Sequence, residues 1–186
     1  IQDLKDHYII CGYGRIGKII CRNLADGGIR LVVVEKNESL KERLEGDGHM
    51  FILGDAKDEG VLVKAGVKRA SGLVAVVESD ADNVYITLTA RSLNPSIYIL
   101  ARAGEELAEK NLLAAGANEV IPPYRIGALR MVNAILRPTV MEFIELATQK
   151  DHLELQLEEI LVGRTDRLPS AVLRDSGIRS ELGLII

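Results

Sequence analysis

The sequence predicts an α/β fold whose core is a parallel β-sheet. Up to Ile121, short runs rich in β-branched residues alternate with stretches of helical periodicity, which is the pattern of right-handed βαβ units. The run Leu31-Val32-Val33-Val34 is apolar on both faces, as a sheet covered by helices on both sides requires. We expect strands at residues 7–11, 30–35, 49–53, 72–77, 97–101 and 119–121, and helices at residues 15–26, 39–45, 59–65, 81–93 and 105–114.

The first strand and helix are joined by a glycine-rich loop, residues 12–17. Its sequence, Gly12-Tyr13-Gly14-Arg15-Ile16-Gly17, is a G-x-G-x-x-G run between an apolar strand and a helix. In such a loop Gly12 permits the tight turn, Gly14 lets the backbone approach a pyrophosphate, and Gly17 lets the helix pack closely on the sheet. N–H groups and the dipole at the helix start attract phosphates. The motif predicts a doubly wound, Rossmann-like nucleotide-binding fold; the alternative is a glycine turn needed only for packing.

Glu35 ends the second predicted strand. A carboxylate at that position can accept hydrogen bonds from the hydroxyl groups of a ribose. It also repels a 2′-phosphate, so the sequence favours NAD or an adenine nucleotide over NADP.

Polar residues follow the next three strands, at the same edge of the predicted sheet. Asp55 and Ala56 can border an adenine, although Asp55 or Asp58 can equally cap the following helix. The acidic run at residues 78–83 can bound the ligand or bind a divalent cation, but helix capping is the better explanation. Arg102 can reach a phosphate or an acidic partner chain, or be a plain surface residue.

The pattern changes after Ile121, where a helix, a turn and a second helix are expected. Pro122-Pro123 suit the first turn of a helix, and Pro138 must end or kink it. We therefore divide the chain into a nucleotide-binding lobe at residues 1–121, a helix-turn-helix crossover at residues 122–148, and part of a small C-terminal α+β lobe at residues 149–186.

The composition excludes several classes of protein. The chain has 186 residues, 47% of them hydrophobic, and a net charge of −4, which argues against a general nucleic-acid binder. No apolar run approaches the ~18 residues that a membrane helix needs. Two cysteines suit a reducing compartment. Because the chain begins with Ile1 rather than Met, we expect it to be a soluble piece of a longer protein.

No residues suited to catalysis stand out. No Tyr has a Lys four positions later, and no His/Cys cluster has zinc spacing. His7, His49 and His152 lie where a structural role is expected, and Cys11 and Cys21 lie inside a predicted strand and helix. The sequence therefore predicts a sensor rather than an enzyme, with no catalytic and no metal-binding residues.

Further motifs accompany the glycine loop, and together they resemble the RCK (KTN, TrkA-N-like) family. Members of that family regulate potassium channels and Trk/Ktr-type potassium uptake systems. The motifs that carry the resemblance are Asp6-His7-Tyr8-Ile9-Ile10-Cys11-Gly12-Tyr13-Gly14-Arg15-Ile16-Gly17, Val33-Val34-Glu35-Lys36, Gly54-Asp55-Ala56, Ala75-Val76-Val77, Ala101-Arg102-Ala103, Gly116-Ala117 and Val120-Ile121-Pro122-Pro123.

The resemblance implies a cytosolic regulatory domain at the cytoplasmic face of the cell membrane. It implies that the helix-turn-helix swaps or docks between protomers, giving homodimers that form an octameric ring on a potassium-conducting pore. The expected ligand is NAD(H) or an adenine nucleotide (ATP, ADP or AMP). Calcium-gated members place carboxylates where this chain has Arg102 and Gly104, so no cation site is assigned. The expected cofactor-binding residues are Gly12, Tyr13, Gly14, Arg15, Ile16, Gly17, Glu35, Lys36, Asp55, Ala56, Val77, Glu78 and Arg102.

Three alternatives stay open beside this hypothesis. Residues 1–6 resemble the polar linker from a pore helix, which favours a channel's own domain over a separate subunit of a Trk/Ktr-type system. From another class, the chain can be a fragment of a small NAD-dependent oxidoreductase. It can also be a scaffold whose nucleotide pocket is vestigial.

Overall fold

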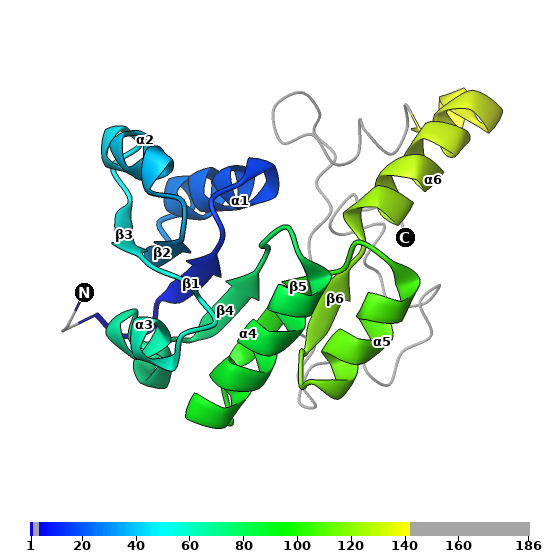
Figure 1. The fold of residues 1–186 in the computed structure, drawn as a ribbon. Coiled ribbons are helices and arrows are strands. Elements are labelled where there is room, and N and C mark those ends of the chain that lie inside the picture. The colour runs from blue at the N-terminus through cyan, green and yellow to red at the C-terminus, as the bar shows by residue number, and fades with distance from the viewer. Residues whose placement is uncertain (2–3, 142–186) are drawn as a thin grey trace, which may run out of the picture. The chain divides into compact units, whose positions relative to one another are not determined.

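The fold is centred on a six-stranded sheet in which every pairing is parallel, in the order β3-β2-β1-β4-β5-β6 (Figure 1). The computed structural model describes residues 1 and 4–141. The strands are β1 (Tyr8–Cys11), β2 (Leu31–Glu35), β3 (Met50–Leu53), β4 (Gly72–Ala75), β5 (Tyr98–Arg102) and β6 (Glu119–Ile121). The strand order reverses between β1 and β4, which makes the carboxyl ends of these two strands the switch point of a doubly wound sheet.

Helices alternate with the strands along the chain, as the sequence predicts. They are α1 (Arg15–Asp26), α2 (Lys41–Gly46), α3 (Glu59–Lys64), α4 (Asp80–Leu93), α5 (Glu106–Ala114) and α6 (Pro123–Leu136), with short 3₁₀ turns η1 (Glu38–Leu40) and η2 (Val67–Arg69). Strand β4 ends at Ala75, two residues before the predicted bound at 77, and the next two residues, Val76 and Val77, line a cleft.

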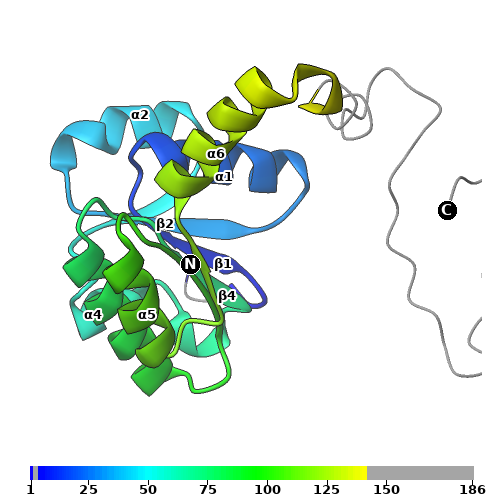
Figure 2. The ribbon, with the colours of Figure 1, turned by 90° about the vertical axis from the view of Figure 1, so that its right-hand side faces the viewer.

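The sheet separates two apolar cores, one on each face. On one face, Ile10 of β1 packs with side chains from α1 and α2, among them Cys21 and Leu44. On the other, Ile9 packs with side chains from α3, α4 and α5, among them Leu62. Figure 2 shows α1 and α2 on the opposite side of the strands from α4 and α5. Neighbouring residues of one strand thus enter different cores, which explains why the central strands are apolar at every position.

Three polar or thiol side chains of this lobe are structural. His7 is fully buried just before β1, with Nε2 2.8 Å from the carbonyl oxygen of Ala65. Cys11 and Cys21 are both fully buried, one in each core. Burial raises the pKa of the Cys11 thiol, and it raises the pKa of Cys21 to about 12. Neither thiol is therefore ionised near neutral pH, as expected of residues inside a strand and a helix.

The chain divides into two compact units, residues 1–131 and 132–186. Helix α6 ends at Leu136, two residues before Pro138, where the sequence predicts an end or a kink. Most of the second predicted helix, and the whole predicted lobe at residues 149–186, lie outside the described residues, so the domain boundaries stay predictions. Among the helices that the structure describes, none has the length and apolar composition needed to cross a bilayer.

Candidate nucleotide-binding site

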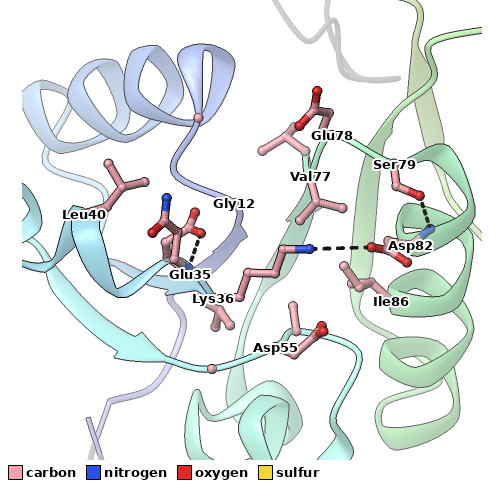
Figure 3. A pocket seen from close by; sticks show the side chains of 16 residues that line it. Gly12, Glu35, Lys36, Leu40, Asp55, Val77, Glu78, Ser79, Asp82 and Ile86 are labelled. Carbon is pink, nitrogen blue, oxygen red and sulfur yellow. Dashed lines mark hydrogen bonds and ion pairs between the residues drawn. The ribbon is translucent and has the colours of Figure 1, made fainter.

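A cleft of about 450 Å³ opens at the carboxyl ends of the central strands, at the switch point of the sheet (Figure 3). This is where ligands bind in open α/β sheets. Its lining consists of Gly12, Gly14, Val34, Glu35, Lys36, Asn37, Leu40, Gly54, Asp55, Ala56, Val76, Val77, Glu78, Ser79, Asp82 and Ile86. The structure therefore brings together predicted residues that follow four different strands.

The three glycines of the glycine loop have different physical roles. Gly12 has a φ of +105°, which L side chains rarely adopt. A Cβ on Gly17 would overlap the carbonyl oxygen of Gly12. Gly14 differs: its backbone is extended (φ −73°, ψ −162°), and no described atom beyond its chain neighbours lies within 4 Å of where its Cβ would be. Backbone conformation at Gly12 and packing at Gly17 therefore explain why these two residues are glycines. Neither explains why residue 14 is a glycine.

Tyr13 is not among the residues that line the cleft, and its side chain lies in one of the two apolar cores. The ring is 1% exposed in the core between the sheet and α1 and α2. Its hydroxyl donates a hydrogen bond of 2.7 Å to Asp47, and its ring makes an edge contact with His49. Burial and the bond to Asp47 raise the pKa of Tyr13, and the same bond lowers the pKa of Asp47. Tyr13 therefore anchors the glycine loop to the residues between α2 and β3.

Glu35 is 8% exposed and accepts two backbone hydrogen bonds. One oxygen accepts from the N–H of Tyr13 at 2.6 Å, and the other accepts from the N–H of Asn37 at 2.8 Å. The carboxylate thus ties the end of β2 to the glycine loop and is held in one orientation. Each oxygen keeps acceptor capacity for a second donor, such as a hydroxyl of a ribose. The sequence predicted the acceptor, but the tie to the loop was missed.

Two lysines and two aspartates form a charged network along the cleft. The Lys57 ammonium lies 2.9 Å from Asp82 and 3.6 Å from Asp55, and the Lys36 ammonium lies 4.0 Å from Asp82. In Figure 3 the Lys36 side chain extends from the β2 side toward Asp82 on α4. The bond to Asp82 raises the pKa of Lys57. The pairing of Lys57 with Asp82 joins residues that follow different strands, so the sequence does not indicate Lys57 and places Asp82 only in an acidic run.

The structure shows which of the polar residues at this edge of the sheet cap the following helices. Asp58 caps α3 by accepting from the N–H of Gly60, and Ser79 caps α4 by accepting from the N–H of Asp82. Asp55 instead lines the cleft and accepts from the backbone N–H of Lys57 at 2.9 Å. Asp80 accepts from the backbone N–H of Gly104 at 2.8 Å. Among the described residues, no group of His, Cys, Asp and Glu is arranged to hold a metal ion.

Some predicted residues lie outside the lining of the cleft. Arg15 is exposed in the first turn of α1, and Ile16 packs against the core next to α1 and α2. Gly17 is buried beneath Gly12. Arg102 is next to the cleft, where Nη1 donates to the carbonyl oxygen of Val77 at 3.3 Å. Ligand contacts by these residues stay predictions.

Comparison with known proteins gives a consistent family. The TrkA-N domain family matches residues 8–123. Probable potassium channel protein 2 and potassium channel protein 1 of Methanocaldococcus jannaschii are 43% and 40% identical to this chain over its whole length. The chain spans 56% of the length of both. Ktr system potassium uptake protein C of Bacillus subtilis is 26% identical over 98% of the chain and 80% of that protein.

Solved structures with the same fold include nucleotide complexes. The TrkA-N domain of the Escherichia coli inner membrane protein ybaL is 29% identical, covers 72% of this chain and 98% of its own, and superposes with a TM-score of 0.68. The GsuK channel bound to NAD and GsuK bound to ADP are each 33% identical over 68% of this chain, with a TM-score of 0.63. These matches cover 23% and 33% of the respective GsuK chains. The glycine loop, the strand order and these relatives agree with one another, and the chain belongs to the TrkA-N (RCK) domain family.

Proposed function

We propose that the chain is a ligand-sensing regulatory domain of a potassium channel, and that its ligand is NAD(H) or an adenine nucleotide. The observation that carries the proposal is Gly14. Its backbone conformation is open to any residue, and no described atom beyond its chain neighbours lies within 4 Å of where a Cβ would be, so the described part of the fold does not require a glycine there. A phosphate that must approach the backbone does require one.

The cleft offers a complement to each part of such a ligand. The first N–H groups of α1, which begins directly after Gly14, provide donors and a positive dipole end for phosphates. Glu35 accepts from the ribose, and Asp55 and Ala56 border the adenine. Lys36 and Lys57 supply positive charge beside the phosphates, while Val77 and Glu78 form the opposite wall. The related GsuK structures bound to NAD and to ADP support this class of ligand.

We propose further that ligand binding acts on a membrane pore. The two Methanocaldococcus jannaschii relatives are potassium channel proteins that extend beyond this chain, which favours the domain of a channel over a separate uptake subunit. Residues Ile126, Leu129 and Met131 at the start of α6 are half or more exposed, which suits contact with a second protomer in a homodimer and an octameric ring. A ligand shifts such an assembly only through different affinities for its two arrangements.

Isothermal titration of the chain with NAD⁺, NADH, ATP, ADP and AMP tests the binding proposal. We expect Gly14→Asp to abolish binding, because a carboxylate fills the approach path and repels phosphates. Gly46→Asp is the matched control: it adds the same side chain at a position outside the cleft lining, where no described atom beyond its own helix and chain neighbours lies within 4 Å of the Cβ. Both variants should keep the wild-type melting temperature to within about 2 °C, as exposed substitutions do. Binding that survives in Gly14→Asp, or is absent from the wild type, contradicts the proposal.

The oxidoreductase alternative predicts a different result from the same protein. It requires hydride transfer between the nicotinamide and a second substrate, with a group placed to move a proton. We expect a regulatory domain to bind NAD⁺ and NADH without interconverting them when small alcohols, aldehydes and 2-oxo acids are supplied. Turnover that disappears in Gly14→Asp supports the enzyme instead.

A further inference from the structure

Arg102 lies between the wall of the cleft and the start of α6. Its Nη1 donates to the carbonyl oxygen of Val77, a residue that lines the cleft. On the other side, its guanidinium carbon lies 5.5 Å from the centroid of the Tyr124 ring, within the range of a cation–π contact. Tyr124 is the second residue of α6, and this part of the helix belongs to the same compact unit as the cleft. The Arg102 side chain therefore contacts both the wall of the cleft and the start of α6.

The backbone around Arg102 is firmly held. The buried Asn83 side chain donates to the carbonyl oxygens of Val77 and Arg102, at 3.1 and 3.2 Å, and accepts from the N–H of Val77 at 3.1 Å. Strand β5 pairs with β6 at Arg102 and Ile121, and α6 follows directly after β6 (Figure 1). Because the strands and Asn83 hold the main chain, the guanidinium is the part of this contact that can move.

The Arg102 guanidinium is incompletely satisfied. Its Nε is buried and has no hydrogen-bond partner among the described residues, and its bond to Val77 is long. Buried donors that lack an acceptor are rare and costly, especially on a charged group. Anionic oxygens are the acceptors that guanidinium groups bind most strongly. The phosphates of a nucleotide in the adjacent cleft would bring such oxygens close to Arg102.

We propose that Arg102 is a positioning residue that reports occupancy of the cleft to α6. When the cleft is empty, the guanidinium stacks on Tyr124 and stabilises the first turns of α6. A bound phosphate supplies the missing acceptor and draws the guanidinium toward the cleft, so that Tyr124 loses its partner and residues 123–131 become easier to open. The inference rests on the proposed function, since it assumes that an anionic nucleotide binds in this cleft.

Hydrogen exchange of the full 186-residue chain, measured by mass spectrometry with and without saturating NAD⁺, tests the inference. A partly exposed cation–π contact is worth ~0.5–1 kcal/mol, so its loss corresponds to about two- to five-fold faster exchange. We expect this acceleration in residues 126–131 on binding, while the amides of the glycine loop become more protected. Titration calorimetry on the same samples measures binding separately.

Two variants of Tyr124 separate this relay from general loosening. Tyr124→Leu removes the aromatic face, so exchange at the start of α6 should be fast with or without NAD⁺. NAD⁺ should bind this variant about two- to five-fold more tightly than the wild type, because binding no longer breaks the contact with Arg102. Tyr124→Phe keeps the ring, and the response to NAD⁺ should remain. The relay is overturned if NAD⁺ binds the wild type and leaves exchange in residues 126–131 unchanged, or if Tyr124→Leu responds like the wild type; in both cases the proposed function stands. If NAD⁺ does not bind, the same comparison is made with ADP, and absence of binding by all five nucleotides overturns the relay together with the ligand class.

Discussion

Replacing Glu35 by Ala should destabilise the protein even when no nucleotide is present. The change removes the acceptor of two backbone N–H groups, and the one on Tyr13 is buried. A hydrogen bond to a charged group contributes about 1.5–3 kcal/mol, and the partly exposed bond to Asn37 is at the low end of that range. We therefore expect a loss of about 3–4.5 kcal/mol in the free energy of unfolding. For a chain of this size that corresponds to a melting temperature lower by about 6–18 °C.

Thermal melts followed by circular dichroism, without nucleotide, measure this effect. Glu78→Ala is the control, because it removes the same charge from the cleft lining at a residue with no backbone N–H bonded to its carboxylate among the described contacts. Equal melting temperatures for the two variants would refute the reasoning that Glu35 holds the glycine loop. Nucleotide affinity is then compared at a temperature where both variants are folded, and we expect Glu35→Ala to bind ~5- to 150-fold more weakly, from ~1–3 kcal/mol of lost ribose hydrogen bonding.

Three further substitutions probe the loop, its anchor and the assembly. Gly17→Ala should prevent stable folding, seen as loss of the cooperative melt, because its Cβ overlaps the carbonyl oxygen of Gly12; a normal melt would contradict the geometry of the loop. Tyr13→Phe should lower the free energy of unfolding at neutral pH, measured by urea unfolding, because it removes the hydrogen bond to Asp47. The folded-state pKa of Asp47 is depressed by Tyr13, so this bond's contribution is present above the ordinary Asp value of about 4 and is lost as pH falls below it. Wild type and Tyr13→Phe should therefore converge in stability at low pH, and a constant difference down to pH 2 would exclude this linkage. Leu129→Ser should weaken oligomers in sedimentation velocity while leaving nucleotide affinity within about two-fold, and oligomers of unchanged size would argue against α6 as the contact.

The sequence predicted the strands and the edge of the sheet where the cleft lies. That success has a physical cause, since strands buried on both faces must be apolar at each position, and loops at the carboxyl ends of parallel strands share one edge. The residues that follow β1, β2, β3 and β4 therefore had to meet, and Gly12, Glu35, Asp55 and Val77 do line one cleft.

Side-chain direction was harder to predict than position in the chain. A loop has no period-two or 3.6-residue repeat, so nothing in the glycine loop indicated that the Tyr13 ring turns into a core while its N–H meets Glu35. The pairing of Lys57 with Asp82 depends on how far β3 and β4 lie apart in the sheet, with two strands between them, and spacing along the chain does not contain that distance.

The two cysteines of the chain make it a convenient background for site-specific labels. Both thiols are fully buried and their pKa values are raised, so thiol-reactive dyes or spin labels meet almost no thiolate in the folded protein. A cysteine introduced at an exposed position, such as Leu107 on α5, would be labelled selectively without first removing the native pair. Distances between labelled copies would then report the arrangement of protomers in solution directly.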